Sequence, residues 1–146
     1  MPVSVEQGVA ILETCGFDAD FSSPNKLPMP DQTDEVHREW RESLILAARE
    51  RGIAFSHGVA AKLVNVYLKV RFVCAGNHAD VRVQCLHPPI DRMLLKALAE
   101  SNFGGLGKRW KSEMNKGWSK FNSADYQGVV DMIRSALGGR PTWTVE

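Results

Sequence analysis

The sequence predicts an all-α fold in a single compact domain over residues 1–146. Three observations lead to this prediction. The apolar residues recur at helical spacing, and glycine or proline interrupts the chain between the apolar runs. A chain of 146 residues, with no internal repeat and no change of composition along it, also suits one hydrophobic core.

The first predicted helix covers 4–15, with Ser4 as its N-cap and Gly16 as its stop. Because proline restricts the backbone and lacks an N–H, the proline-rich stretch 17–30 is predicted to be a loop laid over the surface. Four apolar side chains are expected to hold that loop against the body: Phe17, Phe21, Leu27 and Met29.

The second predicted helix begins at Thr33 and ends near Gly52. Acidic residues in its first turn suit the positive end of the helix dipole. One stripe of the helix is apolar and is expected to face the core, while the arginines are expected to face elsewhere. The stripe is Val36, Trp40, Leu44 and Ala47, and the arginines are Arg38, Arg41, Arg49 and Arg51.

The third predicted helix, 59–73, is apolar on most sides, which indicates a central position. Its β-branched residues leave a strand open, but its length favours a helix. A connection follows over 76–86, with a short extended piece expected at 81–83. Two prolines then stiffen the approach to Asp91, which is expected to cap the next helix.

The remaining chain contains a basic stretch and a last helix. After a glycine-rich break at 102–107, the stretch 107–120 carries five basic residues and one acidic residue, a net charge of +4. The last helix starts at Ser123 and ends at Gly138, and Trp143 in the tail is expected to pack back onto the body. Its predicted inner face consists of Tyr126, Val129, Val130, Ile133 and Leu137.

Composition excludes several classes of protein. The apolar content of 44% and charged content of 24% are ordinary for a globular protein, and a net charge of +1 argues against a polycation. Cys15, Cys74 and Cys85 form no C-x-x-C pair, which argues against a disulfide framework, a zinc site or an iron–sulfur cluster and favours a reducing cytoplasm. No signal peptide or membrane span is evident, and no carboxylate cluster suits the magnesium of a nuclease. We expect a cytoplasmic monomer without a cofactor or a metal.

The stretch 56–91 carries the residues with the clearest chemistry. Lys62 lies about one turn after Gly58, and lysine acts as a nucleophile only when it is neutral, a form that burial and a helix N-terminus both favour. A neutral amine can form a Schiff base. Asp91 at a helix N-cap is expected to stay ionised and to stabilise developing positive charge. The plain alternatives are a solvated lysine and an aspartate that only caps its helix.

Two short motifs in this stretch resemble the helix-hairpin-helix DNA glycosylases. In that superfamily a hairpin G-V-G-x-K precedes a helix, and a loop ending in V-D delivers the catalytic aspartate. Here Gly58-Val59-Ala60-Ala61-Lys62 stands at the hairpin and Ile90-Asp91 ends the loop, with Ala60 in place of the second glycine. The Ala61-Lys62 pair, Lys69 seven residues later and Pro88-Pro89-Ile90-Asp91 resemble the archaeal 8-oxoguanine DNA glycosylase type.

The resemblance implies an all-α domain built around a helix-hairpin-helix, with DNA as its partner. It implies that the target base is flipped out, that Asp91 stabilises positive charge at the sugar, and that Lys62 attacks the anomeric carbon. Backbone amides near Gly58 would bind a phosphate, the basic stretch would bind others, and a tryptophan would stack on a base. The residues expected at the DNA are His57, Gly58, Ala60, Lys108, Arg109, Lys111, Trp110 and Trp118.

Other functions remain open at this point. A non-catalytic all-α module that only binds DNA would carry the same basic stretch. A small helical protein that binds a protein partner would use Lys62 and Asp91 for structure alone. The sequence does not identify the excised base, nor does it separate repair from defence against modified foreign DNA.

Overall fold

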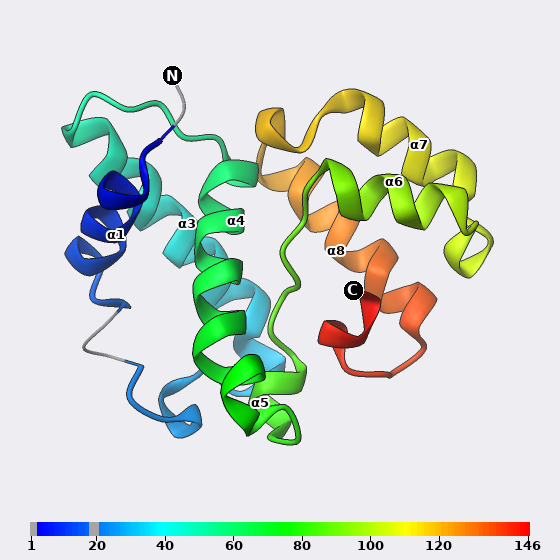
Figure 1. The fold of residues 1–146 in the computed structure, drawn as a ribbon, viewed down its shortest axis with the longest axis horizontal. Helices are drawn as coiled ribbons and strands as arrows, with labels where there is room; N and C mark the ends of the chain where they lie inside the picture. The colour runs from blue at the N-terminus through cyan, green and yellow to red at the C-terminus, as the bar shows by residue number, and fades with distance from the viewer. Residues whose placement is uncertain (1–2, 18–20) are drawn as a thin grey trace.

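The computed structural model describes residues 3–17 and 21–146, and this part of the chain is built from helices without a strand, which confirms the all-α prediction (Figure 1). The α-helices are α1 (Val5–Thr14), α3 (Thr33–Glu50), α4 (His57–Leu68), α5 (Val81–Gln84), α6 (Arg92–Glu100), α7 (Gly107–Lys116) and α8 (Ser123–Leu137). Shorter helical segments lie between them: η1 (Pro24–Lys26), η2 (Pro30–Gln32), η3 (Lys69–Asn77), η4 (Phe103–Gly105), η5 (Trp118–Lys120) and η6 (Thr142–Val145).

Helix α4 occupies the centre of the molecule, as its apolar surface predicts. Figure 1 shows α1 and α3 on one side of it and α6, α7 and α8 on the other. The buried apolar residues form two clusters. Val64 and Leu68 of α4 belong to the cluster shared with α1 and α3, whereas Ala61 belongs to the cluster of α6, α7 and α8. Helix α4 therefore contributes side chains to both apolar clusters.

Three helices begin at the predicted places because a side chain caps each of them. Ser4 and Gln7 form a reciprocal capping box at α1. The Oδ1 atom of Asp91 accepts a 2.9 Å hydrogen bond from the amide of Leu94 at the start of α6. Asn122 caps α8, directly before its first residue. Such caps satisfy N–H groups that have no partner inside the helix.

The loop after α1 is held as predicted by Phe17, Phe21 and Leu27, all buried, but Met29 is 48% exposed and takes no part. The extended piece expected at 81–83 is wrong. Asp80 accepts a 2.8 Å hydrogen bond from the amide of Arg82, and this cap starts the short helix α5 instead.

Helix α4 begins earlier than expected, with Ser56 as its cap and Gly58 already inside its first turn. The amide of Gly58 donates a 3.2 Å hydrogen bond to the carbonyl of Phe121, which brings the start of α4 against η5. A Cβ atom on Gly58 would overlap the carbonyl oxygen of Trp118. Glycine at this position therefore permits a close approach of two backbones.

The substitution Gly58→Ala is expected to destabilise the protein by about 1–3 kcal/mol, because η5 must move away to make room for the methyl group. Gly128→Ala is the matched control: Gly128 also lies inside a helix, a Cβ atom added there would have no neighbour within 4 Å, and the change should stabilise by up to about 1 kcal/mol. Urea denaturation of both variants measures the difference. Equal effects at the two positions would contradict the close approach.

Candidate active site

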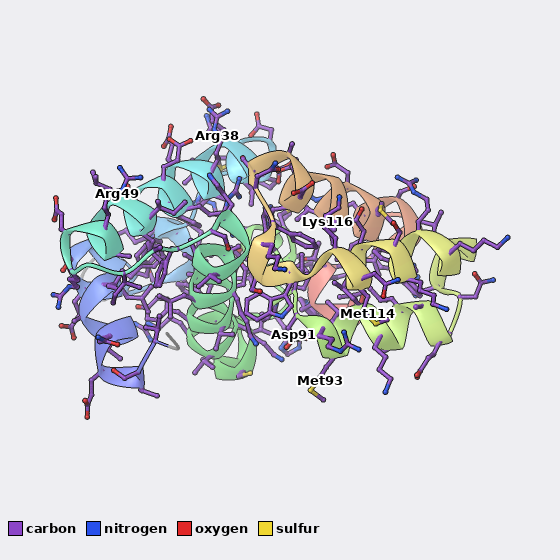
Figure 2. All side chains as sticks on the ribbon, turned by 90° about the horizontal axis from the view of Figure 1, so that it is seen from above. Arg38, Arg49, Asp91, Met93, Met114 and Lys116 are labelled. Atoms are coloured by element: carbon purple, nitrogen blue, oxygen red, sulfur yellow. The ribbon has the colours of Figure 1, made fainter. Side chains whose placement is uncertain are left out.

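The structure brings Lys62 and Asp91 together from two different helices. The Nζ atom of Lys62 on α4 lies 3.3 Å from Oδ2 of Asp91, the cap of α6. Figure 2 shows Asp91 between α4 and the start of α6. Because the other oxygen of Asp91 accepts the Leu94 amide, the carboxylate is fixed in orientation and presents one oxygen to the amine.

An aromatic ring lies on another side of the lysine. The Nζ atom of Lys62 lies 4.7 Å from the centroid of the Trp118 ring, within the range of a cation–π contact. Trp118 belongs to η5, whose position depends on Gly58. The two predicted catalytic residues and one predicted stacking residue therefore meet at one place.

A hollow of about 350 Å³ opens beside this group, lined by Lys62, Trp118 and apolar side chains of α1 and α4. Its volume lies in the range of small-molecule sites, which are about 300–1,000 Å³. The apolar lining includes Val5, Val9, Leu12, Phe55, Val59, Leu63 and Val66. An apolar hollow with one amine at its edge suits a flat ring held chiefly by stacking and shape.

The expectation that Lys62 is buried is wrong. Its side chain is 35% exposed, pairs with the carboxylate of Asp91 and lies over the ring of Trp118. The helix dipole acts within the first turn of a helix, and Lys62 lies beyond the first turn of α4. The ion pair, rather than burial, is the feature that sets the chemistry of Lys62.

The amides predicted to bind a phosphate are already occupied. Gly58 donates to Phe121, Val59 donates to the hydroxyl of Ser56 at 3.1 Å, and Ala60 donates to the carbonyl of Ser56 at 3.0 Å. Gly58 and Ala60 are also buried. Residues 58–60 therefore offer no free amide to a phosphate.

Two other residues predicted at the DNA have structural roles. Trp110 is fully buried, and its Nε1 atom donates a 2.9 Å hydrogen bond to the carbonyl of Phe103, so it has no face free for a base. The Nδ1 atom of His57 accepts a 3.0 Å hydrogen bond from Nε of Arg41. Of the two candidate tryptophans, only half-buried Trp118 lies beside the lysine.

The basic residues remain on the surface. Lys108, Arg109 and Lys111 are exposed on α7, the helix that leads to Trp118. Lys116 at the end of α7 is held instead by Asp125, at 3.1 Å, and by Glu113. Three free cations on one helix are thus available for phosphate contacts.

A buried polar network crosses the molecule between the two apolar clusters, and it begins at Arg41. This arginine was expected to face away from the core, but it is 1% exposed. Its Nη1 atom lies 2.6 Å from Nδ1 of His37, and its guanidinium lies 4.6 Å from the centroid of the Tyr126 ring. In Figure 2, Arg38 and Arg49 of the same helix do point away from the body, as predicted.

The network continues through Asn65 of α4. The Nε2 atom of His37 lies 2.7 Å from the Asn65 side-chain oxygen. The Asn65 amide nitrogen donates to the carbonyl of Pro88 at 3.1 Å and to the hydroxyl of Tyr126 at 3.0 Å. The Tyr126 hydroxyl in turn lies 2.7 Å from Nδ1 of His87. One side chain thus joins α3, α4, α8 and the loop before Asp91.

The hydrogen bonds assign a protonation state to both histidines. Because arginine can only donate, Nδ1 of His37 must accept from Arg41, and Nε2 carries the proton that Asn65 accepts. The Tyr126 hydroxyl accepts from Asn65 and donates to Nδ1 of His87, whose Nε2 then donates to Asp34 at 2.8 Å. Both histidines are neutral in this pattern, and burial lowers the pKa of each.

Asp34 ends the network at the surface. The hydrogen bond from His87 and the nearby guanidinium of Arg134, whose Nη1 atom lies 2.5 Å from the carboxylate, hold the pKa of Asp34 well below its usual range. At the opposite end of the network, burial lowers the pKa of Arg41, and in its middle burial raises the pKa of Tyr126. No group in the chain of bonds is left without a partner, as a buried polar network requires.

Sequence reasoning missed most of this network. Asn65 gave a signal, since it is a polar residue inside the most apolar helix, and His87 gave another by its place before two prolines. Nothing in the sequence indicates that Arg41, His37 and Tyr126 belong to a buried polar network, although Tyr126 was expected on the inner face of its helix.

Within 3–17 and 21–146, no group of three or more His, Cys, Asp or Glu side chains could hold a metal ion. Over the same residues, no helix is both long enough and apolar enough to cross a membrane. Comparison of the chain with protein-family models, with curated proteins and with solved structures gives no match.

Because His37 and His87 are buried and neutral, we expect the free energy of unfolding to fall as the solution becomes acidic. Unfolded histidine has a pKa of about 6.5, so below this pH the unfolded chain binds protons that the folded one does not. The stabilisation that the neutral histidines contribute to the free energy of unfolding is fully present above pH 6.5. It is lost as the pH falls, by up to about 1.4 kcal/mol per histidine for each pH unit. Asp34 adds its own loss only below about pH 4.

Urea denaturation at pH 7.5 and 5.5 measures this loss, with a constant m-value as the check that both states are unchanged. A free energy of unfolding that is equal at the two pH values would contradict the neutral, buried state of both histidines.

Proposed function

We propose that this protein is a DNA glycosylase with abasic-site lyase activity that excises a damaged or modified base. One observation supports the proposal above the others: an amine at the edge of an apolar hollow has a fixed carboxylate 3.3 Å away and an indole ring beside it. The match to the motifs of helix-hairpin-helix glycosylases adds to it.

In the proposed reaction the flipped nucleotide places its base in the hollow and its sugar against Lys62 and Asp91. The ionised Asp91 stabilises the positive charge that develops on the sugar as the glycosidic bond breaks. The ammonium of Lys62 gives a proton to the departing base, which leaves with the electron pair of that bond. The resulting neutral amine then forms a bond to the anomeric carbon.

The Schiff base follows from this intermediate without a further reagent. The amine nitrogen loses a proton, the sugar ring opens, and the ring oxygen takes up a proton. The imine makes the neighbouring C2′–H acidic. Water takes up that proton, and the 3′ phosphate leaves with the electron pair of its C–O bond, which cleaves the strand. The ion pair seen in the structure thus serves as the starting state, with the lysine as proton donor first and nucleophile second.

In this proposal DNA lies along α7. Lys108, Arg109 and Lys111 are exposed there and neutralise phosphates, while Trp118 stacks on a base at the edge of the hollow. This position replaces the amides near Gly58, which are hydrogen-bonded within the fold. A non-catalytic DNA-binding module is the second candidate, since the cations of α7 support it equally.

Borohydride trapping tests the catalytic pair. With DNA containing abasic sites, or oxidised and otherwise modified bases, we expect a covalent adduct that is lost in Lys62→Gln. Asp91→Asn should slow base release about 100-fold or more, a usual cost of removing one group that stabilises charge in a transition state.

Lys69→Gln is the matched control, since it removes another ion-paired lysine, held 2.6 Å from Glu146, at the end of the same helix. It should trap as well as the wild type. If wild-type protein gives neither adduct nor base release on the whole panel but still binds DNA, the non-catalytic module is the better description.

Salt titration of DNA binding tests the role of α7. Each phosphate contact adds about 0.9 to the slope of log K against log salt concentration, so replacing Lys108, Arg109 and Lys111 by glutamine should lower the slope by about 2–3. Arg49→Gln removes an exposed cation from α3 and serves as the control. An equal effect of Arg49→Gln would contradict a binding surface on α7.

A further inference from the structure

Asn65 occupies a particular place relative to the catalytic pair. It lies on α4 three residues after Lys62, and it donates to the carbonyl of Pro88, three residues before Asp91. The residue is 1% exposed, and both polar atoms of its side chain are hydrogen-bonded. The same helix therefore carries the amine and holds the loop that carries the carboxylate.

The loop before Asp91 has few other means of attachment. Pro88 and Pro89 have no N–H to donate, so this part of the loop can bind its surroundings only through carbonyl groups and side chains. His87 is bonded to Asp34 and Tyr126, and Ile90 is buried in the apolar cluster of α6, α7 and α8. Among the described residues, the Asn65–Pro88 bond is the one hydrogen bond between this loop and α4.

We propose that Asn65 is a positioning residue, which sets the separation of Lys62 and Asp91 through its hydrogen bond to the Pro88 carbonyl. The proposal rests on the catalytic role given to this pair. Asn65 does not touch the reacting groups, and it acts through the loop. Without the bond, the polar contact that remains between α4 and the loop is the partly exposed ion pair itself, and such pairs hold geometry weakly.

The direction of this hydrogen bond makes the proposal specific. Pro88 offers an acceptor, so the partner must donate, and His37 offers a proton to the other atom of Asn65, so that atom must accept. Only a side chain with a donor and an acceptor at its end fits both neighbours. Asparagine does so, whereas aspartate of the same shape faces the Pro88 carbonyl with an oxygen that can only accept while it is ionised.

Asn65→Asp is therefore the first test, with Asn65→Ala as a second variant should the buried carboxylate prevent folding. Tyr126→Phe is the control, because it removes another hydrogen bond of Asn65 and one of His87 but leaves the bond to Pro88. It should lower stability without changing the pair. All variants are compared at a temperature at which their amide NMR spectra show a folded protein.

The first readout needs no substrate. Crystal structures of the wild type and the variants measure the distance between Nζ of Lys62 and Oδ2 of Asp91, which is 3.3 Å here. We expect that distance to lengthen by about 1 Å or more in Asn65→Asp and Asn65→Ala and to stay unchanged in Tyr126→Phe, because a pair this exposed holds its geometry weakly. An unchanged distance in the Asn65 variants overturns the proposal.

The second readout is adduct formation at saturating abasic DNA. A displacement of the carboxylate should slow trapping by roughly tenfold or more in the Asn65 variants, while the half-saturating DNA concentration stays within about twofold, because Asn65 has no DNA contact. If folded Asn65→Asp forms the adduct as fast as the wild type does, the positioning role is overturned and the glycosylase proposal stands. If the wild type gives neither adduct nor base release and the Lys62–Asp91 distance still lengthens in the Asn65 variants, the glycosylase is overturned and the positioning role is supported.

Discussion

The rest of the structure depends on the hydrogen bond between Asn65 and His37 and on the chain of bonds that continues from it. These bonds lie between two apolar clusters, where an unsatisfied polar group costs about 1–3 kcal/mol. The chain has one direction: arginine donates at one end, aspartate accepts at the other, and each group between them does both. Such a network forms in one arrangement of the helices.

This arrangement of the helices determines which side chains lie next to each other at the surface. Because Asn65 holds both His37 and the Pro88 carbonyl, α3, α4 and the loop before α6 take fixed positions. Lys62 and Asp91 then meet as a consequence of the interior and need little attraction of their own. A preorganised pair of this kind is what a transition state with developing charge requires.

The parts of the fold that follow from local chemistry could be predicted from the sequence. The caps Ser4 and Asp91 act on amides three residues away, and the apolar face of the last helix follows from its spacing. The short helix α5 was missed because its signal was a single cap, Asp80, before a β-branched pair that equally suits a strand.

The parts that depend on distant partners could not be predicted. The side chain of Arg41 is placed by Ser123, which lies 82 residues further along the chain, and Asn65 bonds a tyrosine 61 residues away. An arginine at the edge of an apolar stripe normally faces solvent, but Arg41 finds partners inside the fold in His37, His57 and Ser123. Gly58 fits a turn and a helix equally well in sequence, and the closeness of Trp118, which requires a residue without a Cβ atom there, appears only in the fold.

The candidate site combines both kinds of information. The sequence predicted Lys62 and Asp91 as a pair, although it expected the lysine to be buried, and the structure places the two side chains 3.3 Å apart. Peptide mapping of the borohydride-trapped complex tests this account most directly. We predict that the sugar remnant is found on Lys62, and an adduct on any other amine of the chain would contradict it.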